Sequence, residues 1–275
     1  MAAALCSGCS TAPFKITDSF ASYYAKNKEE VGSDLKGMAS DLAVLSDSEA
    51  TDPNYQSNDY ADLLINDSTN EVLESYHCFD RLYPASITKV MTALLTLEHG
   101  NMDDEITLKH DINLTENGAV ISTLTKGDTV TVGQVFHTML IKSANDCAVI
   151  LAEYVAGSES KFIDMMNAKA KELGATHTHF VNPNGLHDNN HYTTAYDLYL
   201  IFKEAVKYDT FVDTVSSKDY TMTYTTPKKT QINEYMQSTN YYLLNEFPVP
   251  EGVVMYGGKT GTTSMAKSCL ILMTK

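Results

Sequence analysis

The chain has 275 residues, of which 35 are acidic and 20 are lysine or arginine, so its formal net charge at pH 7 is −15. This charge argues against a nucleic-acid partner and against electrostatic attraction to anionic lipids. The length suits one substantial domain or a domain with an extra lobe, and no apolar run is long enough to cross a membrane.

The first residues, Met1–Cys9, are typical of the end of a lipoprotein signal peptide. A basic beginning and most of the apolar core are missing, so we expect the natural start to lie upstream and Cys9 to be the lipidated residue. Cys6 fits less well, because Leu5 rather than a small residue precedes it. A short irregular start is the alternative. We expect contact with a membrane only through this lipid anchor.

Residues 10–58 are rich in Ser, Asp, Glu and Lys. This composition predicts an acidic polar tether that precedes a folded domain at 59–275. At the start of that domain, 61–66 and 71–76 flank the turn-forming string Asp67-Ser68-Thr69-Asn70, which predicts a β-hairpin.

The string Ser86-Ile87-Thr88-Lys89 opens an apolar run with helical spacing that stops at Gly100. We expect Ser86 in the first turn of a buried helix, with Lys89 on the same face. Burial disfavours a charged amine and lowers its pKa, so Lys89 would be available as a neutral base beside a serine nucleophile. The alternative is a helix start whose lysine merely extends to solvent.

A second string, Ser143-Ala144-Asn145, lies between two predicted helices, Val132–Ile141 and Cys147–Val155. Asn145 or Asp146 is expected to cap the second helix. The functional interpretation places the Ser143 hydroxyl and the Asn145 amide at the rim of a cleft, and the alternative is a cap alone.

The third string, Lys259-Thr260-Gly261, follows the apolar residues Val253–Tyr256 and two glycines, and precedes the strand-like Cys269–Met273. This pattern predicts an antiparallel hairpin in which glycine permits close approach of a ligand. The alternative is an ordinary edge strand with a protective lysine.

Only Lys-Thr-Gly is unique in the chain, and local context must select the other two strings. Ser-x-x-Lys recurs at Ser33/Lys36, Ser158/Lys161 and Ser264/Lys267, and Ser-x-Asn recurs at Ser68/Asn70 and Ser238/Asn240. These other positions lie in polar, glycine-flanked or turn-like stretches, or follow Lys-Thr-Gly in the chain instead of preceding it. The region from about 101 to 240 is predicted to be mostly helical, with helices at Lys161–Leu173 and Ala195–Val206. We therefore expect an α/β lobe and a helical lobe with a cleft between them.

Longer strings extend these motifs, and with them the chain resembles the serine-type D-Ala-D-Ala carboxypeptidases, the low-molecular-mass penicillin-binding proteins. The resemblance runs from about Tyr60 to the C-terminus. It is carried by Tyr83–Lys89, Ser143–Asp146 with Ala152-Glu153, Leu173-Gly174 with Thr178–Phe180, Asn182–Leu186 with His191–Ala195 and Asp197-Leu198, and Gly257–Thr262. The family implies an α/β, β-lactamase/transpeptidase-like fold, with an antiparallel sheet flanked by helices and a mostly helical lobe. It usually continues with another strand and a long helix, so we expect the chain to be truncated at its C-terminus.

The resemblance also implies that residues 59–275 form a DD-peptidase catalytic domain. Ser86 would attack the bond between the two D-alanines of a peptidoglycan stem peptide, with Lys89 as base and Ser143 relaying the proton. Asn145 would hold the substrate amide and Lys89. The backbone N–H groups of Ser86 and Thr262 would form the oxyanion hole. The terminal carboxylate would be bound within the string Lys259, Thr260, Gly261 and Thr262.

The implied reaction needs no cofactor and no metal, and β-lactam antibiotics would acylate the same serine. Four histidines cluster without ligand spacing for zinc: His177, His179, His187 and His191. The family works outside the cytoplasm, in the cell envelope. That location leaves a disulfide between Cys147 and Cys269 open, although scattered positions favour free thiols.

Three alternatives share this fold. A β-lactamase would need a group that activates the deacylating water, and Glu172, Glu234 and Glu246 lie in no string typical of that group. A transpeptidase would use an amine in place of water. A non-catalytic lipoprotein would keep the fold as a module that binds peptidoglycan peptides.

Overall fold

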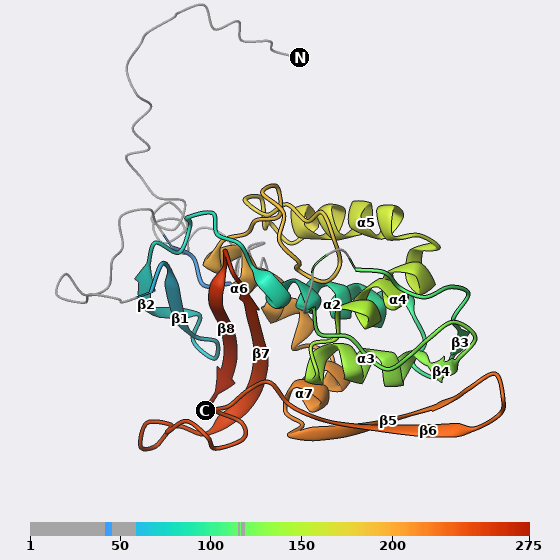
Figure 1. Ribbon diagram of the computed structural model, residues 1–275. Helices are drawn as coiled ribbons and strands as arrows, with labels where there is room; N and C mark the ends of the chain where they lie inside the picture. Colours follow the sequence, from blue (N-terminus) through green and yellow to red (C-terminus); the bar gives the residue numbers. More distant parts are fainter. Residues whose placement is uncertain (1–41, 46–58, 115, 117–118) are drawn as a thin grey trace, which may run out of the picture. The chain divides into compact units, whose positions relative to one another are not determined.

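The computed structural model describes residues 42–45, 59–114, 116 and 119–275 (Figure 1). They fall into two compact units, one with the hairpin at Asp62–Tyr76 and one with Asp59–Ala61 and His77–Lys275. The predicted leader with Cys9 lies outside the described residues. So does the predicted tether at 10–58, except for residues 42–45.

The predicted N-terminal hairpin is confirmed. Strand β1 (Asp62–Asn66) pairs antiparallel with β2 (Glu71–Tyr76). In the turn, the Asn66 Oδ1 atom accepts hydrogen bonds from the backbone N–H groups of Ser68 (3.1 Å) and Thr69 (3.3 Å). The string Ser68-Thr69-Asn70 is therefore turn chemistry and not a second Ser-x-Asn site.

The second unit is built around helix α2 (Lys89–His99), whose residues from Lys89 to Thr96 are all buried. The apolar residues that predicted this helix form the core, since Val90, Met91, Ala93 and Leu94 are at most 1% exposed. Helix α2 is preceded by a 3₁₀ turn, η1 (Ala85–Thr88), which carries Ser86. The predicted helix is thus confirmed, but its first turn is the tighter 3₁₀ form.

Four further helices contact α2 or its neighbours: α3 (Val132–Ile141), α4 (Asn145–Ala156), α5 (Glu159–Glu172) and α6 (Ala195–Ala205). Side-chain oxygens of Thr131, Ser158 and Thr194 cap α3, α5 and α6 by accepting a hydrogen bond from an N–H group of the first turn. The predicted helices at these places are confirmed within about two residues. A short helix, α7 (Asp209–Val215), was not predicted.

The region predicted as mostly helical does carry helices α3 to α7, and it also contains an antiparallel sheet that was not predicted. Its strand order is β3 (Glu105–Thr107), β4 (Thr129–Thr131), β5 (Asp219–Thr225) and β6 (Gln231–Gln237). Strand β5 contacts α3 (Figure 1). Met222 and Tyr224 on β5 are buried, while Thr223 between them is more exposed. The polar alternation in this short stretch is only a weak sequence signal for a strand. Packing against α3 therefore decides that the stretch forms one.

The C-terminal hairpin is confirmed. Strand β7 (Met255–Thr263) pairs antiparallel with β8 (Lys267–Thr274), and Lys259 lies opposite Ile271. Val253 and Val254 precede the strand and are 37% and 58% exposed. Both strands contact η1, which brings the Lys-Thr-Gly string beside Ser86.

Cys147 and Cys269 are free thiols. The disulfide that the sequence left open between Cys147 and Cys269 is therefore not formed. Cys147 lies fully buried within α4, whereas Cys269 is on β8, where its thiol faces the backbone carbonyl of Tyr83 at 3.5 Å. Across the described part of the chain, we find no helix with the length and apolarity that a membrane span requires.

Candidate active site

The three predicted strings meet within the second unit. The Lys89 Nζ atom lies 2.8 Å from Ser86 Oγ and 2.8 Å from Asn145 Oδ1. The Lys259 Nζ atom lies 2.9 Å from Ser143 Oγ. Direct side-chain contacts therefore join all three strings, of which two lie at the starts of helices and one lies on a strand.

Two of the competing strings serve local structure instead. Ser158 caps α5 by accepting a hydrogen bond from the Lys161 backbone N–H, which leaves the lysine side chain uninvolved. Ser238 Oγ accepts a hydrogen bond from the Asn240 backbone N–H at 3.2 Å. Short polar side chains make such bonds at turns and caps throughout proteins, so these strings need no functional explanation.

Lys89 is completely buried, and this burial dominates its chemistry. Burial first, and then the positive charge of Lys259, hold the pKa of Lys89 well below its ordinary value of 10.5. Weaker opposing effects come from Cys147 and Asp146. A neutral amine is therefore accessible at Lys89, as the sequence predicted.

The partners of Lys89 also orient it. Besides Ser86 and Asn145, the backbone carbonyl oxygen of Asn184 lies 2.6 Å from Lys89 Nζ. The Asn145 Oδ1 and Asn184 O atoms can only accept hydrogen bonds. In a neutral amine both N–H groups are used by these acceptors, so the lone pair is left facing the Ser86 hydroxyl. This is the geometry that a base needs to take the serine proton.

The Asn145 side chain is held in one orientation. Its Nδ2 atom donates to the Val120 carbonyl oxygen at 3.0 Å, and its backbone N–H donates to the same oxygen at 2.8 Å. The amide oxygen must then face Lys89. The prediction that Asn145 or Asp146 caps helix α4 was wrong, because Ala144 takes that position without a side-chain bond and both polar side chains turn to the 120–122 segment.

Ser143 and Lys259 form the other half of the site. Ser143 has a left-handed backbone with φ of 63°, a conformation that costs a non-glycine residue about 1–2 kcal/mol. Lys259 is 1% exposed and also donates to the Thr260 carbonyl oxygen at 2.7 Å. Burial lowers the pKa of Lys259 to about 7. Of the ion pairs formed by the described residues, none supplies Lys259 with a carboxylate.

Thr239 joins the site, although the sequence gave it no role. Its Oγ1 atom lies 2.5 Å from Thr260 Oγ1, and its backbone N–H donates to the Ile141 carbonyl oxygen at 3.3 Å. Thr239 sits inside the Ser238–Asn240 string that serves as a turn. Only the strand pairing that brings β6 near α3 and β7 reveals the contact, since no local pattern marks it.

Gly261 allows strand β7 to lie directly against η1, the turn that carries Ser86. A Cβ atom at Gly261 would lie 2.9 Å from the backbone nitrogen of Ser86 and 3.1 Å from the Ala85 Cβ atom. A side chain there would force η1 and β7 apart. The glycine of Lys-Thr-Gly thus places the Ser86 backbone N–H group beside the strand that carries Thr262.

Gly185 has a similar part on the opposite side of the turn. It has φ of 86°, and a Cβ atom there would come 1.8 Å from the Ala85 carbonyl oxygen. The close approach holds Asn184, the preceding residue, against Lys89. Asn184 and Gly185 belong to a string that carried the family resemblance, but their role as supports of the lysine emerges only from the structure.

The histidine cluster contains a buried structural residue. His191 Nδ1 accepts a hydrogen bond from the Val181 N–H at 3.1 Å, and its Nε2 atom lies 2.7 Å from Thr88 Oγ1. Burial lowers the pKa of His191 to about 4, so the ring is neutral and both nitrogens are occupied. Within the described ranges, no group of three or more His, Cys, Asp or Glu side chains is arranged to hold a metal ion.

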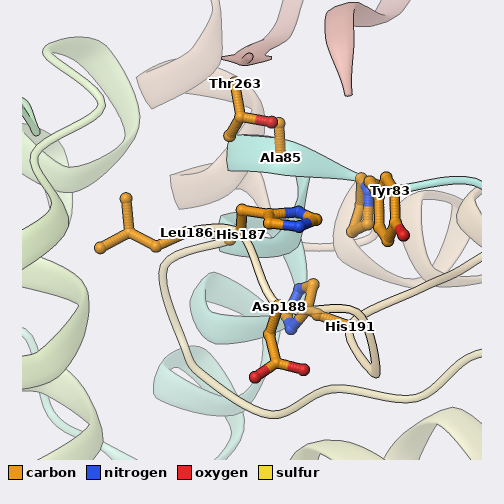
Figure 2. Close-up of a pocket in the computed structure, with 9 residues that line it drawn as sticks. Tyr83, Ala85, Leu186, His187, Asp188, His191 and Thr263 are labelled. Atoms are coloured by element: carbon orange, nitrogen blue, oxygen red, sulfur yellow. The ribbon is translucent and has the colours of Figure 1, made fainter. Parts of the chain in front are cut away.

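A shallow recess lies beside η1, lined by Tyr83, Pro84, Ala85, Gly185, Leu186, His187, Asp188, His191 and Thr263. Figure 2 shows Thr263 next to Ala85, with His187 below them and Asp188 and His191 farther along. The Tyr83 and His187 rings pack edge to face with centroids 4.7 Å apart. The recess therefore borders the segments that hold Ser86, Lys89 and the end of β7.

Sequence comparison identifies relatives with a common description. Residues 47–275 match the profile of the family described as D-alanyl-D-alanine carboxypeptidase. The D-alanyl-D-alanine carboxypeptidase DacF of Bacillus subtilis is 35% identical over 217 residues, covering 78% of this chain and 53% of the relative. DacC of Escherichia coli is 32% identical over 213 residues, covering 74% and 50%. The chain spans about half the length of these two curated relatives.

Solved structures give the same result for the fold. The DD-transpeptidase of Streptomyces K15 superimposes with a TM-score of 0.69 at 28% identity, covering 78% of this chain and 83% of that one. The curated D-alanyl-D-alanine carboxypeptidase of the same strain is 31% identical over 218 residues, covering 75% and 73%. The predicted β-lactamase/transpeptidase-like fold is confirmed.

Proposed function

The chain belongs to the D-alanyl-D-alanine carboxypeptidase family, and we propose that it is a serine DD-carboxypeptidase. It removes the terminal D-alanine from peptidoglycan stem peptides through an acyl-enzyme on Ser86. One observation carries the proposal: the Nζ atom of a fully buried lysine lies 2.8 Å from Ser86 Oγ, and its two other contacts are to oxygens that only accept hydrogen bonds. Lysines in such a setting act as bases at neutral pH.

In the acylation step, Ser86 Oγ attacks the carbonyl carbon of the penultimate D-alanine while its proton passes to Lys89. The backbone N–H groups of Ser86 and Thr262 stabilise the oxyanion, which is typically worth about 3–4 kcal/mol for each donor. Ser143 relays that proton from Lys89 to the leaving nitrogen as the C–N bond breaks, so Lys89 is neutral again and Ser143 keeps its hydroxyl. Water then attacks the acyl ester and restores the Ser86 hydroxyl, with Lys89 again as base.

Carboxylate recognition follows from the charge of the second lysine. Lys259 is a buried amine whose pKa is lowered by burial without a compensating acidic partner. A substrate carboxylate supplies that partner, and the hydroxyl groups of Thr260 and Thr262 lie on the same strand to accept or donate further bonds. In an ordinary peptide the α-carboxylate is free only at the C-terminal residue, so a carboxylate clamp next to the scissile bond favours removal of a terminal residue.

β-Lactams carry a carboxylate next to a strained amide, so we expect them to acylate Ser86 and to leave slowly. The glutamates weighed as water-activating groups of a β-lactamase are engaged elsewhere or exposed. Glu234 binds Lys142 and Thr123, Glu172 is 67% exposed beside Lys169, and Glu246 is exposed. These positions favour slow rather than rapid β-lactam turnover.

Incubation with a stem pentapeptide ending in D-Ala-D-Ala tests the proposal. We expect the chain to release one D-alanine per peptide, detected by D-amino-acid oxidase, and to leave a tetrapeptide. Saturable peptide binding without release would contradict the proposal and indicate a binding module of the same fold. Cross-linked dimers in place of free tetrapeptide would indicate a transpeptidase.

The same proposal includes an extracytoplasmic location in the cell envelope, with Cys9 as a lipid attachment site. It rests on the small residues Ser7 and Gly8 before Cys9 and on the place where relatives of this family act. When the complete gene is expressed with an alkyne-labelled fatty acid, we expect Cys9→Ala to abolish labelling and Cys6→Ala to leave it unchanged. Labelling that persists in Cys9→Ala would contradict this part of the proposal.

A further inference from the structure

A short segment, Val120–Thr123, is linked to both ends of the Ser143–Asn145 turn, and we call it the brace segment. On the C-terminal side, Ser122 donates its backbone N–H to both carboxylate oxygens of Asp146, at 2.9 and 3.0 Å. Its hydroxyl donates to the same carboxylate at 2.5 Å. Asp146 is 4% exposed and directly follows Asn145, so the brace segment is fixed to the start of α4.

On the N-terminal side, the brace segment is tied to Lys142 through a carboxylate of another strand. Glu234 on β6 accepts hydrogen bonds from the backbone N–H (3.0 Å) and the hydroxyl (2.6 Å) of Thr123. Its other oxygen pairs with Lys142 Nζ. Lys142 directly precedes Ser143, so the ion pair reaches the residue next to the strained serine.

The Glu234 side chain is only 9% exposed, so its charge is largely removed from water. Burial alone would raise the pKa of Glu234, but the hydrogen bonds from Lys142 and Thr123 outweigh that effect and lower it. The carboxylate is therefore ionised at neutral pH and fully engaged. Tyr224 closes the group by donating to the Thr123 carbonyl oxygen at 3.3 Å.

We propose that Lys142 and Glu234 are positioning residues that hold Ser143 in its left-handed conformation within hydrogen-bond distance of Lys259. The inference rests on the proposed function, because it assigns the pair an effect on acylation of Ser86. Neither residue touches the reacting atoms. They act through the backbone of the Ser143–Asn145 turn, which the brace segment fixes at both ends. A strained turn keeps its shape only when several contacts around it hold it there.

A double-mutant cycle tests this inference, with Lys142→Met, Glu234→Gln and the combined variant. The readouts are the acylation rate constant with benzylpenicillin, the dissociation constant of the complex before acylation, and the thermal midpoint. We expect each single variant to slow acylation about 10²-fold with little change in that dissociation constant, because a displacement of about 1 Å can have this effect. The combined variant should be no slower than the slower single variant, since the pair acts as one unit.

A second ion pair supplies a matched control. Lys169 on α5 pairs with Glu98 on α2 at 3.0 Å, and the two side chains are 13% and 15% exposed. Glu98 lies nine residues beyond Lys89, roughly 13 Å along the helix. Lys169→Met is expected to lower the thermal midpoint about as much as Lys142→Met and to leave the acylation rate constant unchanged. Lys142→Arg should recover most of the rate, because it keeps the charge and the reach.

The outcomes separate the two proposals. If the wild-type chain forms a penicillin adduct and both single variants acylate at its rate, the positioning inference is wrong, whatever the change in thermal midpoint. The same holds if the Lys169 control slows acylation equally. If the wild-type chain forms no adduct, the proposed function itself fails. If Glu234→Gln does not fold, Glu234→Asp replaces it, because that substitution keeps the charge and shortens the side chain by one methylene. Slower acylation by a folded Glu234→Asp variant would support the inference.

Discussion

Replacing Ser86 by alanine is expected to abolish the covalent adduct that the chain forms with benzylpenicillin. Intact-mass spectrometry should show one penicilloyl group on the wild-type protein and none on the variant, even after long incubation. D-alanine release should also fall to background, because the proposed mechanism forms the ester on the Ser86 oxygen and alanine supplies no replacement for it. This is the largest effect that we expect from any single substitution.

Ser158→Ala is the matched control for that experiment. Ser158 is also the serine of a Ser-x-x-Lys string, but it caps α5 and has no contact with the site. Its loss should lower the free energy of unfolding by about 1 kcal/mol and leave the adduct unchanged. An adduct that persists in Ser86→Ala, or that disappears in Ser158→Ala alone, would show that the wrong string was assigned to the nucleophile.

The second large effect concerns Lys259. We expect Lys259→Met to lower kcat/KM for a stem pentapeptide about 10³-fold, since losing one partner of a buried charge pair typically costs about 2–5 kcal/mol. The same peptide with a C-terminal carboxamide should be a poor substrate of the wild-type protein and should lose much less in the variant. An equal loss for the acid and the amide would mean that Lys259 does not bind the carboxylate.

The pH dependence of the same reaction gives an independent check on Lys259. The free protein has a Lys259 pKa of about 7, and only the protonated form attracts a carboxylate. Therefore kcat/KM for the acid peptide should fall as pH rises above about 7, by about tenfold per pH unit. In Lys259→Met, the charge that lowers the pKa of Lys89 is gone, so the acidic limb should move to higher pH. A profile that Lys259→Met leaves unchanged in both limbs would exclude these assignments.

The sequence alone located the parts of the site that depend on local pattern. The apolar spacing from Val90 onward predicted the buried helix α2, and the interval of three residues put Lys89 beside Ser86 on one face. The apolar run and glycines before Lys259, with the strand-like segment after it, predicted the β7–β8 hairpin. These features follow from backbone periodicity, which acts over a few residues and is therefore legible in the sequence.

Only the tertiary structure decided which atoms complete the site. The Asn184 carbonyl and the Thr239 hydroxyl reach Lys89 and Thr260 from distant parts of the chain, and no local pattern distinguishes them from other asparagines and threonines. The same is true of Glu234, whose strand β6 went unpredicted. The depth of burial that lowers the pKa of both lysines also comes from elements folded around them. Hydrogen bonding and desolvation depend on neighbours in space, so they become fixed only when the chain is packed.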